Sequence, residues 1–283
     1  MSSILLNGLE LSHQLRGEIT HKIEQLKKIS VIQPKLAVIL IGDHIASRIY
    51  VANKEKACHQ VGINCDILRF EESITEKELI QKIELLNQDS SVHGILIQLP
   101  LPSHIHVNHI IHQIDPKKDV DGFHPYNLGL LALGQAKLRA CTPYGIIQLL
   151  EAYHIPLKGI DAIMIGSSRI VGLPMTLELL KKQATVTTCH KNTKNLQDKI
   201  KNNQLVIIAT GHRGLIEPSS FHKDHIIVDV GIHRIQNKVC GDVNFEIAQD
   251  KVGYISPVPG GVGPMTITAL LQNIIKAFEI QLD

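Results

Sequence analysis

The apolar positions of this chain alternate between helical and strand-like patterns. From residue 8 to residue 29 they recur every three or four positions, which predicts a helix with one apolar face. The run KLAVILI is apolar at nearly every position and predicts a buried strand. The next expected elements are a helix over 46–60, a strand over 63–70, a helix over 75–87 capped by Thr75, and a strand over 93–102 that ends at prolines.

A second alternating series follows the polar loop DPKKDVDGFHP. It opens with a helix over 141–154, for which Thr142 is the expected N-cap and Pro143 the first helical residue. Its expected strands are DAIMI, ATVTTC, QLVIIATG and HIIVDVGI. This order predicts an α/β fold with parallel sheets, in two units that meet near residues 120–142. A last helix over about 265–279 is an extra element, expected to return to the first unit.

Composition narrows the class of protein. A chain of 283 residues is long enough for two domains, and a net charge of +2 gives no reason to expect nucleic acid or an anionic membrane as a partner. The five cysteines are far apart and form no CxxC pair, which favours free thiols and no metal site. The N-terminus lacks a signal-peptide pattern, and the apolar runs are too short to span a bilayer. We therefore expect a cytoplasmic protein that binds no membrane.

The segment IGSSRIVG is the first candidate for ligand binding. Gly166 ends an apolar strand and Gly172 lies in the opening of a helix, so backbone N–H groups of this turn could approach a pyrophosphate. The segment is not the G-x-G-x-x-G fingerprint, and a strand-to-helix turn often needs a glycine for packing alone. Both interpretations stand on this segment by itself.

Tyr50 and Lys54 are four residues apart and share one face of the expected helix. Such a pair is usually a surface contact, but a lysine beside an aromatic wall can also transfer protons. Short-chain dehydrogenases use a Tyr-x-x-x-Lys pair after their glycine turn, whereas this pair precedes the turn by over a hundred residues. Gln98, at the carboxyl end of a strand, could cap a loop or orient either a substrate amide or the Lys54 amine.

Two more segments have both a structural and a functional interpretation. Asp119 and Asp121 stand beside a glycine, as in many turns, yet a buried Asp121 would suit the paired N–H donors of an aminopyrimidine ring. The stretch VPGGVGPMT, three glycines and two prolines before an apolar run, is a shaped loop that feeds a helix. That loop is either a tight turn or a ligand-binding loop.

Taken together, these segments resemble the bifunctional methylenetetrahydrofolate dehydrogenase/cyclohydrolase family, in order and over nearly the whole chain. The segments that carry the resemblance are SRIYVANKEKAC, GILIQLPLP, KDVDGFHPYNLG, CTPYGIIQLL, GSSRIVGLPM, ATVTTCHKNTKNL, IVDVGI, GDVNFE and PVPGGVGPMT. The resemblance implies two α/β domains around a cleft. Residues 1–120, joined by a C-terminal helix over 265–283, would bind folate, and residues 121–264 would form a Rossmann-like dinucleotide-binding domain.

The resemblance also implies roles for residues at the folate site. Tyr50 would stack on the aminobenzoyl ring, Lys54 would be the catalytic lysine positioned by Gln98, and Asp121 would bind the pterin. Leu99 and the loop residues Pro259, Gly260 and Gly261 would line the same site. The implied reactions of one-carbon metabolism are oxidation of 5,10-methylenetetrahydrofolate to the methenyl form and its hydrolysis to 10-formyltetrahydrofolate, with tetrahydrofolate derivatives as ligands and a homodimer as the assembly.

The implied dinucleotide-binding residues are Thr142, Gly166, Ser167, Ser168, Val171, His190, Lys191 and Ile232. NADP is the expected cofactor, since the strand ATVTTC is followed by basic residues and no acid. Many relatives have an arginine where Ser167 stands, so the expected preference is modest and NAD is not excluded. Two other classes stay open: a two-domain NAD(P)-dependent dehydrogenase of another small substrate, and a non-catalytic ligand-binding homologue.

Overall fold

The computed structural model describes residues 3–29, 32–236 and 238–282. The chain divides into two compact units, each with its own parallel sheet. One unit, here called the three-stranded unit, comprises Gln14–Cys141 and Ile267–Asp283. The other, the six-stranded unit, comprises Met1–His13 and Thr142–Thr266. The prediction of an α/β fold with two α/β units is confirmed.

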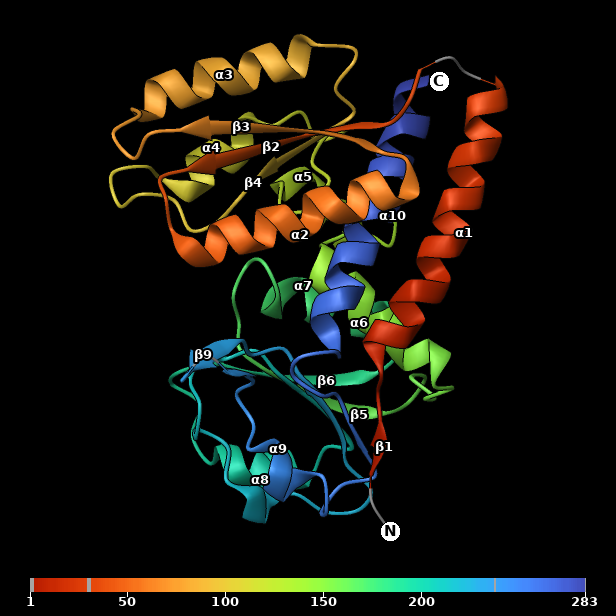
Figure 1. Ribbon diagram of the computed structural model, residues 1–283. Coiled ribbons are helices and arrows are strands. Elements are labelled where there is room, and N and C mark those ends of the chain that lie inside the picture. Colours follow the sequence, from red (N-terminus) through yellow and green to blue (C-terminus); the bar gives the residue numbers. More distant parts are fainter. Residues whose placement is uncertain (1–2, 30–31, 237, 283) are drawn as a thin grey trace. The chain divides into compact units, whose positions relative to one another are not determined.

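The three-stranded unit is built on a central apolar strand. Its sheet has the order β3 (Asn64–Phe70), β2 (Lys35–Ile41), β4 (Gly94–Ile97), and all neighbours are parallel. Helix α2 (Ile45–Val61) covers one face of the sheet, and α3 (Glu76–Gln88) lies over the other (Figure 1). Because β2 is covered on both faces, its side chains are buried from Leu36 to Ile41, which explains its unbroken apolar run.

Local sequence signals set the ends of these elements. Thr75 caps α3 as predicted, through a capping box in which its side chain accepts from the Glu78 amide and the Glu78 carboxylate accepts from the Thr75 amide. Two short helices complete this part of the chain, α4 (Val107–Gln113) and α5 (Pro125–Ala132).

Two long helices, α1 (Gly8–Ile29) and α10 (Val262–Leu282), run from the six-stranded unit into the three-stranded unit. Inside the three-stranded unit, Lys22 of α1 forms an ion pair with Glu279 of α10 at 2.6 Å. The Phe278 ring packs edge-on against His93, with 4.7 Å between ring centroids. The C-terminal part of α10 is therefore an integral part of the core of this unit.

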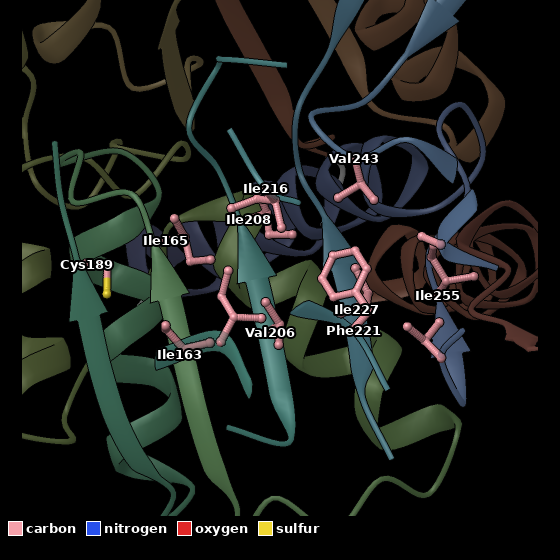
Figure 2. Packing of buried hydrophobic residues seen from close by; sticks show 13 residues of the cluster. Ile163, Ile165, Cys189, Val206, Ile208, Ile216, Phe221, Ile227, Val243 and Ile255 are labelled. Atoms are coloured by element: carbon pink, nitrogen blue, oxygen red, sulfur yellow. The ribbon is translucent and has the colours of Figure 1, made fainter. Parts of the chain in front are cut away.

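The six-stranded unit holds a wholly parallel sheet. Its strand order is β1 (Ile4–Leu5), β11 (Tyr254–Ile255), β8 (Ile226–Asp229), β7 (Leu205–Ile208), β5 (Asp161–Ile165), β6 (Thr185–Cys189). Apolar side chains of neighbouring strands form one continuous core cluster (Figure 2). The other elements are α6 (Cys141–Ala152), α7 (Gly172–Lys181), α8 (Leu196–Lys201), α9 (Phe245–Ala248), the 3₁₀ turn Pro218–Ser220, and the antiparallel pair β9 (His233–Ile235) and β10 (Lys238–Cys240).

The strand order of this sheet reverses direction at β5. The chain passes from β5 to β6 on one side and then returns to β7 on the other side of β5. In open parallel sheets, ligands bind outside the carboxyl ends of the strands at such a reversal. The loops that follow β5 and β7 are therefore the place to look for a dinucleotide site.

Three boundaries differ from the sequence predictions. The two residues of β1 pair with β11, so the start of the chain joins the six-stranded unit and not the domain expected over 1–120. Helix α6 begins at Cys141, so Thr142 is inside the helix and is not its N-cap; its hydroxyl instead lies 3.1 Å from that of Thr266. The last helix begins at Val262, three residues before the predicted start, because Pro264 lies in the first turn, where its missing N–H costs no intrahelical hydrogen bond. No helix in the described ranges has the length and apolarity to cross a bilayer.

Candidate functional site

The three-stranded unit brings Lys54 and Gln98 together. Lys54 projects from the third turn of α2, and Gln98 is the first residue after β4. The Lys54 ammonium donates to the Gln98 side-chain oxygen at 3.2 Å, and the Gln98 amide nitrogen donates to the Leu99 carbonyl at 2.7 Å. The second bond fixes the orientation of the amide, so that its oxygen is the atom presented to the lysine.

The two acids of the VDG loop have different roles. The Asp119 side chain is buried and accepts hydrogen bonds from the amides of Phe123 and His124 and from the Asn127 side chain. It therefore holds the turn together, as the structural interpretation predicted. Burial raises the pKa of Asp121, and the nearby positive charge of Lys54 opposes that rise. Asp121 and Lys54 thus form one electrostatic cluster.

The segment that carries Asp121 is held by groups that the sequence analysis did not identify. Asn273 of α10 donates through its side chain to the carbonyls of Val120 and Arg139, at 2.8 and 2.7 Å. The Cys141 amide donates to the Asp121 carbonyl at 3.2 Å. Gly122 has a positive φ of 74°, and a Cβ there would lie 2.3 Å from the Arg139 carbonyl carbon. The only local sequence signal for this packing was the glycine after Asp121.

An apolar pocket lies at Asp121. Its walls are Ile95, Ile97, Leu99, Ile111, Ile114 and Phe123, with the carboxylates of Asp119 and Asp121 as its polar groups. Tyr50 lies one helical turn before Lys54 and is 39% exposed. The apolar walls and the Asp121 carboxylate together have the chemistry that a ring with N–H donors would contact. The predicted residues Leu99 and Asp121 share this pocket.

The turn from β5 to α7 is packed tightly against the end of β7. Gly166 has a φ of 123°, and a Cβ there would lie 2.3 Å from the Ala209 carbonyl oxygen. A Cβ on Gly172 would lie 2.1 Å from the Gly166 oxygen. Ser168 accepts hydrogen bonds from the amides of Val171 and Gly172 at the start of α7. Packing therefore accounts for both glycines, and the N–H groups at the start of α7 are a candidate anion-binding feature only by their position at a helix N-terminus.

The other predicted dinucleotide-binding residues also lie in the six-stranded unit. His190 and Lys191 directly follow β6, Ile232 is three residues beyond β8, and Ser167 follows β5. All four are exposed and lie beyond the carboxyl ends of β5, β6 and β8 in the parallel sheet. Thr142 is not in one of these loops: it lies in the first turn of α6, the helix that precedes β5.

The loop Pro259–Gly261 has packing of its own within the six-stranded unit. Gly260 adopts a φ of 110°, and its carbonyl accepts from the Leu9 amide at 2.8 Å. The Gly261 amide donates to the Pro257 carbonyl at 2.8 Å, and a Cβ on Gly261 would lie 2.7 Å from that oxygen. These contacts support the tight-turn interpretation, and a role of the loop in folate binding stays a prediction.

Sequence analysis missed a second cluster of acids. Asp229 at the end of β8 and Asp242 after β10 are both buried. They bind backbone amides of the loops at the carboxyl ends of β7 and β8. Neither lies beside a glycine turn that resembles a known fingerprint, although GDVNFE was part of the family resemblance. Within the residues that the structure describes, no group of three histidine, cysteine, aspartate or glutamate side chains could hold a metal ion.

Comparison with known proteins covers both units. Residues 6–121 match the model of the tetrahydrofolate dehydrogenase/cyclohydrolase catalytic domain, and residues 140–282 match that of its NAD(P)-binding domain. The chain is 47% identical over 276 residues to the "Bifunctional protein FolD" of Francisella philomiragia, covering 97% of this chain and 98% of the relative.

Solved structures show the same likeness. The FolD methylenetetrahydrofolate dehydrogenase/cyclohydrolase of Campylobacter jejuni superposes with a TM-score of 0.96 at 47% identity, with 99% of each chain covered. The Trypanosoma brucei enzyme, solved with NADP and an inhibitor, superposes with a TM-score of 0.95 at 28% identity, over 100% of this chain and 99% of that one. The chain therefore belongs to the tetrahydrofolate dehydrogenase/cyclohydrolase family.

Proposed function

We propose that this chain oxidises 5,10-methylenetetrahydrofolate with NADP and hydrolyses the resulting methenyltetrahydrofolate to 10-formyltetrahydrofolate. The observation that carries the proposal is the cluster of Lys54, Gln98 and Asp121 inside the region that matches the family's catalytic domain. Bifunctional enzymes of this family are its relatives at 45–47% identity over nearly the full chain.

The folate would bind in the three-stranded unit. Asp121 would accept two parallel hydrogen bonds from the aminopyrimidine edge of the pterin, since a carboxylate suits paired donors. The apolar wall that includes Leu99 would contact the flat ring. Tyr50, half-exposed one turn from Lys54, would stack on the aminobenzoyl ring.

The residues of the six-stranded unit fit a dinucleotide. The Gly166–Gly172 turn is closely packed backbone that opens α7, and the N–H groups of the helix N-terminus would attract a pyrophosphate. Strand β6 is followed by His190 and Lys191 and by no acid, so a 2′-phosphate meets no negative charge there. The loop after β5 carries Ser167, Ser168 and Val171, and the loop after β8 carries Ile232. Thr142 lies in the same unit. When bound, the dinucleotide supplies a hydride acceptor.

The two reactions ask different things of the chain. In the oxidation, the folate nitrogens stabilise the methenyl cation, so the residues mainly hold the ligands in position. In the hydrolysis, water adds to that cation and the ring opens, which requires proton movement. Lys54 would move those protons; its hydrogen bond to Gln98 and its closeness to Asp121 support this role.

The proposal is tested by an absorbance assay of dinucleotide reduction with 5,10-methylenetetrahydrofolate, with NADP and NAD compared at equal concentrations. A parallel assay follows the loss of methenyltetrahydrofolate. Both activities are expected, with NADP preferred. If dinucleotide reduction fails and folates do not raise the melting temperature, the chain is instead a dehydrogenase of another small substrate. If neither ligand class binds, it is not an enzyme of this reaction.

We also propose that the enzyme is a cytoplasmic homodimer. All five cysteines are free thiols, as expected in a reducing compartment. The homodimer rests on the family resemblance, and light scattering at micromolar concentration tests it, since a monomer mass would refute it.

A further inference from the structure

The carboxylate of Asp242 is a hub for the loop after β7. One of its oxygens accepts from the Thr210 amide at 2.7 Å, the Thr210 hydroxyl at 2.7 Å and the Gly211 amide at 3.0 Å. Its other oxygen lies 2.7 Å from Nε2 of His233. Because an ionised carboxylate only accepts, this geometry places the hydrogen on Nε2 of His233.

The electrostatics keep Asp242 ionised. Its side chain is fully buried, which alone would raise its pKa, but the hydrogen bonds from His233, Thr210 and Gly211 more than offset the burial and leave the pKa below its ordinary value. A buried carboxylate with four donors holds them in one geometry, since removing any one leaves an uncompensated charge.

Asp229 holds the backbone on which Asp242 stands. It accepts from the amides of Gly231, Asp242 and Val243 at 2.9, 3.0 and 2.8 Å. A Cβ on Gly231 would lie 2.3 Å from the Asp242 carboxylate, and one on Gly241 would lie 2.0 Å from that of Asp229. The two acids therefore join the segments that follow β8 and β10, and they leave no room for a side chain at Gly231 or Gly241.

The same contacts lead to the turn after β5, at the start of α7. Ala209 precedes the two residues that Asp242 holds, and its carbonyl is the atom against which Gly166 packs. A rigid path thus runs from His233 through Asp242 to the loop after β7 and on to the turn after β5. Those two loops flank the reversal of strand order, where a parallel sheet binds its ligand.

We propose that Asp242, oriented by His233, is a positioning residue for the dinucleotide. It fixes the loop Ala209–Gly211 against the Gly166 turn and thereby sets the shape of the surface that receives the cofactor. This inference rests on the proposed function, because it names a determinant of cofactor binding in that same reaction. Asp242 itself contacts backbone amides, the Thr210 hydroxyl and His233, so its effect on the reaction is indirect.

The test uses the independence of the two activities. Hydrolysis of methenyltetrahydrofolate consumes no dinucleotide, so a defect confined to cofactor positioning should spare it. Asp242→Asn keeps the size of the side chain but leaves one acceptor oxygen for four donors. We expect the KM for NADP to rise about tenfold or more, because one or more charge-assisted hydrogen bonds that position the loop are lost. The KM for methylenetetrahydrofolate and the cyclohydrolase rate should stay within about twofold of wild type.

Two further variants separate positioning from bulk stability. His233→Gln retains an N–H donor for Asp242, so it should keep a lower KM for NADP than His233→Ala. Asp224→Asn is the matched control, because it removes the same charge from another aspartate–histidine pair, His222–Asp224 at 3.7 Å. Asp224 lies just before the amino end of β8, whereas Asp242 acts at the carboxyl ends of the strands. Asp224→Asn should leave both activities unchanged.

The outcomes are decisive in either direction. A normal KM for NADP in Asp242→Asn overturns the proposal, and so does a parallel loss of cyclohydrolase and dehydrogenase activity, which would show a general folding role. Calorimetric titration with NADP alone measures the same effect without turnover. A wild-type chain that binds NADP but oxidises no folate would refute the proposed function, while a weakened Kd in Asp242→Asn would still support this inference.

Discussion

Replacement of Lys54 by methionine tests the proton-transfer role most directly. Methionine keeps the length and apolar bulk of the side chain but loses the ammonium that donates to Gln98 at 3.2 Å. A positioned acid or base contributes a factor of about 10²–10⁴ in rate, equivalent to about 3–5 kcal/mol of barrier. The cyclohydrolase rate should therefore fall about a hundredfold or more. Dehydrogenase activity should fall less, because hydride transfer depends first on the position of the ligands.

The structure adds a second consequence, through Asp121. Burial raises the pKa of Asp121, its neighbour Asp119 adds to the rise, and the charge of Lys54 counteracts it. Without that charge, the pKa of Asp121 rises further. If the ionised carboxylate binds the pterin, folate affinity falls as pH drops through this pKa. The KM for folate should thus begin to rise at a higher pH in Lys54→Met than in wild type.

The assay follows loss of the methenyl chromophore and dinucleotide reduction across a pH series. Lys56→Met is the matched control, since Lys56 is an exposed lysine on the same helix. It should change neither rate nor pH profile. A Lys54→Met variant that hydrolyses methenyltetrahydrofolate at the wild-type rate would show that another group moves the protons. An unchanged pH profile for folate binding would show that Asp121 does not sense Lys54.

Three further changes have outcomes set by the structure. Asn273→Ala removes the donor from the buried carbonyls of Val120 and Arg139. Urea denaturation should show that the free energy of unfolding falls by about 2–6 kcal/mol, at about 1–3 kcal/mol for each carbonyl. A smaller fall would mean that water replaces the amide. Burial raises the pKa of Asp229 from 3.8 to about 6, so folding is favoured with the proton bound, and stability should drop by about 2 kcal/mol as pH rises from 4 to 7. Asp229→Asn should flatten that pH dependence, and an unchanged slope would assign it to other groups. Ser167→Arg should widen the ratio of kcat/KM for NADP over NAD, because arginine offers a fork of donors to a phosphate, and a constant ratio would place the 2′-phosphate elsewhere.

Strands and helices that owe their formation to local pattern were predictable from the sequence. The all-apolar run of β2 and the capping pair Thr75 and Glu78 each specify their element without help from distant residues. The two-residue strand β1 lacks such a signal. Ile4 and Leu5 are a strand only because they pair with Tyr254 and Ile255, some 250 positions later in the chain.

Candidate site residues could likewise be predicted where local pattern sets their position, and not where distant contacts do. Lys54 and Gln98 could be found because a helix face and a strand end place their side chains in known directions. The different roles of Asp119 and Asp121 could not be predicted, since they depend on donors that converge from Phe123, His124 and Asn127. Asn273 was missed for a similar reason: its partners Val120 and Arg139 are more than 130 positions away, and nothing local marks a polar residue on an apolar helix as a structural clamp.

Glycines are weaker guides to function than the charged cluster, and the loop before α10 shows why. Gly260 has a positive φ, and Gly261 lacks room for a side chain beside Pro257, so the chain's own backbone explains both without a ligand. Gly263 has an ordinary φ and no described atom within 4 Å of the place a Cβ would take, so packing does not explain it. In contrast, the cluster brings the Lys54 ammonium, oriented by Gln98, close to the buried Asp121 carboxylate, whose pKa is raised by burial. Charged groups perturbed in this way gather at functional sites, which is the physical reason to assign the cluster to chemistry.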